Sequence, residues 1–103
     1  MEIRELLAPE AVAAHQRATS KKQLFQEIGA RAGDIYRLSA RGVFEALLER
    51  ERLGSTAMGR GVAAPHARID GVDSIRGLFL RLEKPIAFDA MDDEPVDLVF
   101  ALI

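Results

Sequence analysis

Apolar residues recur at helical spacing in two stretches of the chain. The first stretch follows Ser20, and its apolar positions, three or four residues apart, are Leu24, Phe25, Ile28 and Ala32. Ser20 and Gln23 have the spacing of a capping box, in which two side chains satisfy free backbone N–H groups at a helix start. Glycine is common just after the last turn of a helix. We therefore predict a helix from Ser20 to Gly33.

The second stretch predicts a helix that begins at Ser39 and ends at Gly54. Its apolar stripe consists of Val43, Phe44, Leu47 and Leu48. At about 100° per residue, Glu51 falls near the centre of this stripe and Arg50 falls at its edge. Two interpretations stay open: the last turn frays, or its charges point into a site at the C-terminal end of the helix.

Beyond Gly54 the pattern changes from helical spacing to strands and turns. Residues 54–61 hold too many glycines for a regular element. Residues 75–82 alternate, with three leucines on one side, and predict a strand with one buried face. Residues 96–103 are apolar except for Asp97 and predict a strand buried on both faces. Three shorter pieces complete the chain: a strand or turn in 2–12, an extended piece in 85–88 and an acidic turn in 89–94.

The chain stops inside this last strand pattern. Chain termini normally lie at the surface, whereas the final six residues are all apolar. Either the last strand closes an edge of the sheet or the sequence is a truncated piece of a longer domain, and we favour truncation. An uncovered apolar strand is a template for pairing with another chain, so we expect self-association through residues 96–103.

Composition narrows the class of protein. With 103 residues, the chain is long enough for one domain, residues 1–103, and too short for two. The net charge of −2 leaves no overall basic surface for nucleic acid and no polybasic membrane anchor. The absence of cysteine excludes disulfides and thiolate chemistry. No apolar run reaches the ~18–20 residues of a membrane span, and the N-terminal residues lack the pattern of a signal peptide, so we expect a cytoplasmic protein.

Of the two histidines, His66 is the candidate for chemistry. It follows Pro65, whose ring fixes φ at its own position and stiffens the approach to the histidine. The glycines before it let backbone N–H groups come close to an anion. A neutral imidazole is an available nucleophile at cytoplasmic pH, although a histidine in a loop is more often only solvated. His15 has no neighbours that suggest a site and is expected at the surface.

Three other patterns do not fit the sites that they suggest. Residues 59–64 match the dinucleotide-binding fingerprint with alanine in the third place, but a predicted helix precedes them and Pro65 follows at once. Residues 54–61 lack the Gly-Lys-Ser/Thr of a phosphate-binding P-loop. The acidic residues of 89–94 lack the spacing of a calcium-binding loop and are expected to be solvated. We therefore predict no metal and no cofactor.

Two segments together resemble a known family. The first is Arg50-Glu-Arg-Leu-Gly-Ser55-Thr56, continued by Gly59-Arg-Gly-Val-Ala-Ala-Pro65-His66, and the second is residues 82–98, LEKPIAFDAMDDEPVDL. In the same order, they are similar to motifs of the enzyme IIA domains of the bacterial phosphoenolpyruvate-dependent phosphotransferase system. Within the fructose/mannitol-type superfamily, the nitrogen-regulatory branch is the most similar. The resemblance covers nearly the whole chain.

This resemblance implies an α/β fold, a mixed β-sheet flanked by helices, with the C-terminal part of the family domain absent after Ile103. It implies that His66 accepts a phosphoryl group on Nε2 from the phosphohistidine of an HPr-like carrier, without a metal. Arg50, Ser55 and Thr56 are then expected to stabilise the phosphate: the guanidinium would offset its charge and the hydroxyls would donate to its oxygens. A IIB domain and regulatory target proteins are further expected partners.

Two functions stay open at this stage. The first is a phosphohistidine phosphocarrier with a regulatory, nitrogen-type role. The second is a non-catalytic protein-interaction module or an inactive fragment of a IIA domain. Because the C-terminal part of the family domain is absent, the sequence leaves open whether the chain acts as a phosphotransferase.

Overall fold

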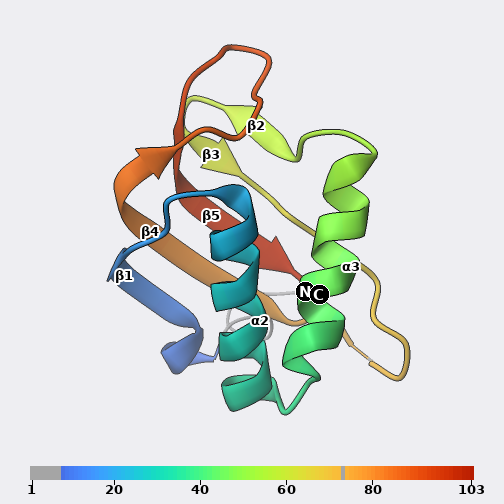
Figure 1. Ribbon diagram of the computed structural model, residues 1–103. Coiled ribbons are helices and arrows are strands. Elements are labelled where there is room, and N and C mark those ends of the chain that lie inside the picture. The colour runs from blue at the N-terminus through green and yellow to red at the C-terminus, as the bar shows by residue number, and fades with distance from the viewer. Residues whose placement is uncertain (1–7, 73) are drawn as a thin grey trace.

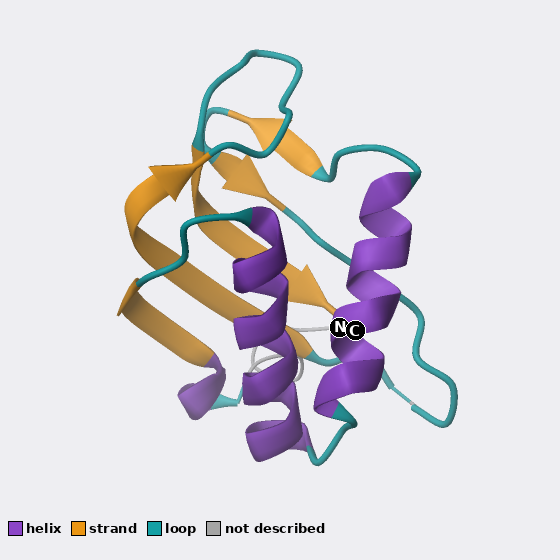
Figure 2. Cartoon of the chain, in the orientation of Figure 1, coloured by secondary structure: helices purple, strands orange, loops and turns teal. Residues whose placement is uncertain are grey.

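The structure of the chain is a computed structural model that describes residues 8–72 and 74–103, so the prediction for residues 2–7 lies outside the described range. Its elements are η1 (Pro9–Ala11), β1 (Val12–Gln16), α2 (Lys21–Tyr36), α3 (Ala40–Arg52), β2 (Ala57–Gly59), β3 (Val62–Ala63), β4 (Gly77–Ile86) and β5 (Val96–Leu102). They form two layers, a five-stranded sheet and a pair of helices, α2 and α3, that both lie on one side of it (Figure 1, Figure 2). The predicted mixed α/β fold is confirmed.

The sheet is mixed, and β5 lies at its centre. The strand order is β1-β4-β5-β3-β2. β1 runs parallel to β4 and β3 runs parallel to β5, whereas the pairs β4–β5 and β2–β3 are antiparallel. In the register of β4 and β5, Leu80 lies opposite Val99 and Leu78 lies opposite Ala101, and all four side chains are fully buried. The hydrophobic core therefore sits between the two central strands and the helices.

The two predicted helices form where expected. The Ser20 and Ser39 hydroxyl oxygens accept the backbone N–H groups of Gln23 (3.1 Å) and Gly42 (3.0 Å), which confirms the predicted Ser20 cap and the predicted start at Ser39. Gln23 Oε1 accepts the N–H of Thr19 (2.6 Å) and not that of Ser20. The apolar residues of both stripes are buried or half-buried: Leu24, Phe25, Ile28, Ala32, Val43, Phe44, Leu47 and Leu48. The predicted end of the first helix at Gly33 is wrong by about one turn. Tyr36 donates its hydroxyl proton to the carbonyl of Gly77 (2.8 Å), and this contact with β4 anchors the extra turn.

The start of α3 packs directly against α2 at Gly29. A Cβ atom built at this position would lie 2.5 Å from the backbone carbonyl oxygen of Ala40, at the start of α3. Real Cβ atoms essentially never approach so closely, and a backbone atom cannot rotate away as a side chain can. The glycine that weakens the helical pattern of α2 is therefore the residue that lets α3 pack against it.

The glycine-rich segment holds more order than its composition predicts. β2 and β3 are short antiparallel strands inside and just after it, so the expectation of an irregular segment is wrong for residues 57–59. The turn between them places Gly59, Arg60 and Gly61 at positive φ, which glycine adopts at low cost. The backbone N–H of Arg60 donates to the carboxylate of Asp92 (2.8 Å), which ties this turn to the acidic loop.

The strand predictions hold with three corrections. β4 runs through Pro85 to Ile86, so the separate extended piece of residues 85–88 merges with it. β5 is buried on only one face: Leu98 and Phe100 are half-exposed, because both described helices lie on the opposite side of the sheet. β5 also pairs with a strand on each side, so it does not close an edge of the sheet.

Lys21 joins three segments that are far apart in the sequence. Its Nζ donates to Glu51 Oε2 (2.9 Å) at the end of α3 and to Asp89 Oδ2 (3.0 Å) in the acidic loop, and it lies 4.8 Å from the centroid of the Phe88 ring. The Glu51 carboxylate is buried, whereas Asp89 is exposed. The ion pair with Asp89 therefore stabilises the fold less than the ion pair with Glu51. Burial lowers the pKa of Lys21, but the hydrogen bonds and charges of the two carboxylates outweigh it and raise the pKa above its ordinary value.

Gly29→Ala should destabilise the fold. Alanine favours a helix by ~1 kcal/mol over glycine, but its Cβ would push α3 away, and overpacking of this kind typically costs about 1–3 kcal/mol. Urea denaturation measures the change in the free energy of unfolding. Gln26→Ala, on the exposed side of the same helix, serves as the control and should change it by less than about 0.5 kcal/mol. Equal stability of Gly29→Ala and the parent would contradict the close approach.

Lys21→Met should lower the free energy of unfolding by about 3 kcal/mol, the lower end of the range for removing one partner of a buried ion pair, because the buried Glu51 carboxylate loses its cation. Since the pKa of Lys21 is raised on folding, its contribution is fully present below the unfolded-state pKa and is lost as pH rises through the higher folded value. Denaturation at pH 7 therefore measures the whole effect. Lys22→Met, at the neighbouring exposed lysine, is the control, and a similar loss in both variants would mean that Lys21 has no special contact.

Candidate functional site

His66 is fixed over the end of β5 by backbone hydrogen bonds on both of its sides. The N–H of Leu102 donates to the carbonyl of Pro65 (2.9 Å), and the N–H of Ala67 donates to the carbonyl of Leu102 (3.1 Å). This parallel bridge continues the pairing of β3 with β5. Pro65 is buried, whereas the His66 side chain is exposed. The backbone is thus held by the central strand while the ring faces solvent.

One hydrogen bond orients the imidazole ring. Nδ1 of His66 lies 3.0 Å from the carbonyl oxygen of Ala64. A carbonyl oxygen can only accept, so Nδ1 carries the proton in this contact and Nε2 keeps its lone pair. The N–H of Ala64 in turn donates to the carbonyl of Thr56 (3.0 Å). An exposed imidazole held in this way can act through Nε2 as a nucleophile or a base.

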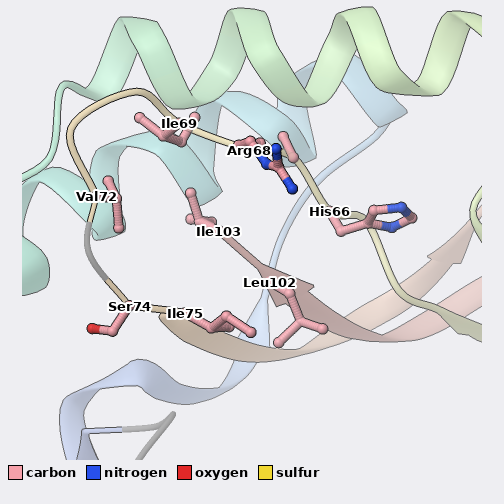
Figure 3. A pocket seen from close by; sticks show the side chains of 9 residues that line it. His66, Arg68, Ile69, Val72, Ser74, Ile75, Leu102 and Ile103 are labelled. Atoms are coloured by element: carbon pink, nitrogen blue, oxygen red, sulfur yellow. The ribbon is translucent and has the colours of Figure 1, made fainter.

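A largely apolar hollow of about 430 Å³ begins beside His66 (Figure 3). Its apolar walls come from the loop after His66 and from the end of β5, and include Ile69, Val72 and Ile103. The His66 ring lies at one end of the hollow and points away from these side chains, with Arg68 between them (Figure 3). Arg68, a cation that the sequence analysis did not single out, therefore lines the same hollow as the histidine.

Arg50 lies in the last turn of α3, and Ser55 lies on the segment that joins α3 to β2. Nη1 of Arg50 donates to the carbonyl of Gly54 (3.0 Å). Ser55 Oγ donates to the carbonyl of Phe88 (2.6 Å) and accepts the N–H of Ala57 (3.2 Å). Both side chains therefore have backbone partners within the chain, and a contact of either with phosphate stays a prediction.

Thr56 is joined to the histidine through its backbone. Its side chain is buried, and Oγ1 donates its proton to Glu51 Oε1 (2.7 Å). A hydroxyl has a single proton to donate, so in this arrangement Thr56 has none for a phosphate oxygen. Its carbonyl accepts from Ala64, the residue that orients the His66 ring. Donation from the Thr56 hydroxyl to phosphate stays a prediction. In the structure, Thr56 is linked to His66 through its main-chain carbonyl and Ala64.

Two residues near the site were not assigned from the sequence. The sequence leaves the orientation of Glu51 undecided, and it does not single out Lys21. Glu51 is buried within α3, which continues to Arg52, so fraying is not observed. That the charges of the last turn point into a functional site stays a prediction. The signal for Glu51 is its place at the centre of an apolar stripe. Lys21 has no comparable signal, because its partner Glu51 lies thirty residues away in the sequence.

The remaining candidates lie elsewhere. His15 is an exposed residue of β1, as expected. In the acidic loop, Asp92 accepts the N–H groups of Arg60 (2.8 Å) and Glu94 (3.0 Å), and these two hydrogen bonds lower its pKa. Over residues 8–72 and 74–103, no three His, Asp or Glu side chains are grouped so that they could hold a metal ion. Among the same residues, no helix has the length and apolar character needed to cross a membrane.

Comparison with known proteins gives a consistent result. The family model of the phosphoenolpyruvate-dependent sugar phosphotransferase system, EIIA 2, matches residues 5–103. A nitrogen regulatory protein of Bradyrhizobium diazoefficiens is 50% identical over 103 residues, which are 100% of this chain and 67% of the relative. A nitrogen regulatory protein of Escherichia coli is 41% identical over 105 residues, and the match covers 64% of that relative. The chain thus spans about two thirds of the length of these relatives.

Solved structures agree with the sequence matches. The crystal structure of nitrogen regulatory protein IIA-Ntr from Neisseria meningitidis has a TM-score of 0.91 and 44% identity, covering 97% of this chain and 68% of that one. The complex of enzyme IIAMTL and phosphorylated enzyme IIBMTL from Escherichia coli shares the fold, with a TM-score of 0.78 at 20% identity, covering 94% of this chain and 70% of the matched one. The chain therefore belongs to the EIIA 2 family of the phosphoenolpyruvate-dependent sugar phosphotransferase system.

Proposed function

We propose that the chain is a phosphohistidine phosphocarrier in which Nε2 of His66 accepts a phosphoryl group from an HPr-like carrier. The observation that carries this proposal is the state of the ring. It is exposed, the backbone groups of Pro65 and Ala67 on either side are bonded to Leu102, and Nδ1–H is donated to the Ala64 carbonyl. That arrangement leaves one nitrogen, Nε2, with a lone pair that faces solvent. Membership of the EIIA 2 family supports the same reaction.

The transfer needs little chemistry from the protein. The lone pair of His66 Nε2 attacks the phosphorus atom of the donor phosphohistidine, and the bond between phosphorus and the donor nitrogen breaks, leaving its electron pair on that nitrogen. The Nδ1 proton stays on the His66 ring, so no base is required. Catalysis then consists of in-line positioning and of stabilising the charge on the phosphoryl oxygens. For the second task we propose Arg50 and the Ser55 hydroxyl, which would turn from the Phe88 carbonyl to the phosphate, while the Thr56 hydroxyl stays on Glu51.

The partners follow from the relatives. Nitrogen regulatory proteins support a regulatory role for the phosphorylated and free forms of the chain. The complex of enzyme IIAMTL with phosphorylated enzyme IIBMTL supports a IIB domain as a further partner. We place the protein in the cytoplasm, where such carriers meet.

A protein-interaction module without transfer is the second candidate function. It is favoured by the second face of the sheet, where the half-exposed rings of Phe79 and Phe100 pack edge-to-face at 6.4 Å and no described helix covers them. Val12, on the neighbouring part of the sheet, is 53% exposed. Self-association through the last strand stays a prediction, with this face as its surface.

His66→Ala should abolish phosphorylation, because it removes the proposed acceptor nitrogen. The chain is incubated with phosphoenolpyruvate, enzyme I and an HPr-type carrier, and intact mass detects one acid-labile phosphoryl group per parent chain. His15→Ala, the matched control, should be labelled like the parent. Labelling of His66→Ala would contradict the assignment, and an unlabelled parent would favour the interaction module.

Arg50→Ala should slow phosphoryl transfer by roughly tenfold or more while changing stability little, since the guanidinium would act only on the charge of the transferring group. Arg50→Lys should recover part of the rate, because an ammonium lacks the planar fork of donors. Rapid-quench kinetics with the phosphorylated carrier measure the rate. Arg52→Ala, two residues on and exposed, is the control; if Arg50→Ala transfers at the same rate as Arg52→Ala, Arg50 has no role in the reaction.

A further inference from the structure

Glu51 is a buried carboxylate that accepts from three donors, two of which belong to Thr56. Its oxygens accept the Thr56 N–H (3.1 and 3.3 Å), the Thr56 hydroxyl (2.7 Å) and the ammonium of Lys21 (2.9 Å). The residue is only 8% exposed, and so is Thr56. Two hydrogen bonds from the same residue, backbone and side chain, fix both the position and the rotation of Thr56 relative to the end of α3.

From Thr56 the contacts lead directly to the imidazole. The Thr56 carbonyl accepts the N–H of Ala64 (3.0 Å), and the Ala64 carbonyl accepts Nδ1–H of His66 (3.0 Å). Two residues therefore separate the end of the helix from the reactive ring: Glu51 holds Thr56, Thr56 holds Ala64, and Ala64 holds His66. A shift of Thr56 would move the carbonyl that sets the tautomer of the ring.

Packing alone does not account for a carboxylate at this position. Residue 51 falls on the same face as Val43 and Leu47, which are fully or almost fully buried. Replacing both members of a buried ion pair by apolar side chains of similar volume is often neutral or stabilising, so a leucine at position 51 with an apolar partner at position 21 would serve the core as well. What a leucine cannot supply is an acceptor for the N–H and O–H of Thr56.

We propose that Glu51 is a positioning residue for His66, acting through Thr56 and Ala64 to keep the imidazole in the Nδ1–H tautomer with Nε2 free. Lys21 pairs with the buried carboxylate at 2.9 Å, and this pairing contributes to the raised pKa of Lys21. The proposal rests on the proposed function in one respect: the free Nε2 matters to the reaction only if His66 is the phosphoryl acceptor.

The test compares two substitutions of Thr56. Thr56→Ser keeps the hydroxyl that donates to Glu51, whereas Thr56→Val keeps the shape and loses it. In both, ¹⁵N NMR of the unphosphorylated chain at a pH above the histidine titration reports which ring nitrogen carries the proton. His15, exposed and in the same molecule, is the internal reference. Glu51→Leu is the third variant. It places an apolar side chain on the buried face of α3 and removes the acceptor of the two Thr56 hydrogen bonds.

We expect the Nδ1–H form of His66 to be retained in Thr56→Ser and to lose population in Thr56→Val and Glu51→Leu, toward the tautomer mixture of His15. The rate of phosphorylation should fall by roughly tenfold to a hundredfold in the same two variants, as for a misplaced reacting group, and by less than about twofold in Thr56→Ser. Folded variants with the parent ring spectrum would overturn the proposal, whatever their rate.

The ring spectrum separates this proposal from the proposed function. If the parent chain is not phosphorylated but the tautomer of His66 responds to Thr56→Val, the positioning by Glu51 stands and the phosphocarrier role fails. If the parent is phosphorylated at His66 but the tautomer does not respond, the phosphocarrier role stands and the positioning by Glu51 is wrong.

Discussion

The parallel pairing of residues 62–67 with β5 is the constraint on which the site depends. β3 is only two residues long, yet its bonds continue past Pro65 to Leu102, so that the backbone of His66 is held by the central strand of the sheet. β5 is itself fixed by β4 on its other side and by the helices packed on its buried face. The reactive ring is thus exposed while the backbone beneath it belongs to the most constrained part of the fold, as positional catalysis requires.

Ion pairs and hydrogen bonds to carboxylates hold the segments around this site in place. Glu51, Lys21 and Asp89 connect the end of one helix, the start of the other and the acidic loop, and the buried carboxylate of Glu51 also holds Thr56 beside β2. Asp92 ties the turn between β2 and β3 to the same loop. The acidic loop therefore has a structural role on two sides of the hairpin that leads to His66, which explains why a segment without regular structure has a defined place in the fold.

The sequence predicts the parts of this fold that depend on local pattern. Both serine caps, both apolar stripes and the alternation of β4 are visible in the sequence because helix and strand periodicities repeat over short distances. The parts that it does not predict depend on contacts between distant residues. The extra turn of α2 requires Tyr36 to reach Gly77, and the pairing of Lys21 with Glu51 requires two helices to meet. The sequence does not predict the short strand β2, because the glycines in and around it indicate a loop. Its order comes from pairing with β3 and from the hydrogen bond of Asp92 to the adjacent turn.

In the candidate site, too, local pattern is visible in the sequence, whereas contacts that depend on the fold are not. His66 is singled out by Pro65, the glycines before it and the family motif, but its tautomer depends on Ala64 and so on the fold.

The most direct test of the account is the position of the phosphoryl group, read from long-range ¹H–¹⁵N correlations of the phosphorylated, ¹⁵N-labelled chain. The account predicts phosphorus on Nε2 of residue 66, with the proton still on Nδ1. A phosphoryl group on Nδ1 of His66, or on His15, would contradict it.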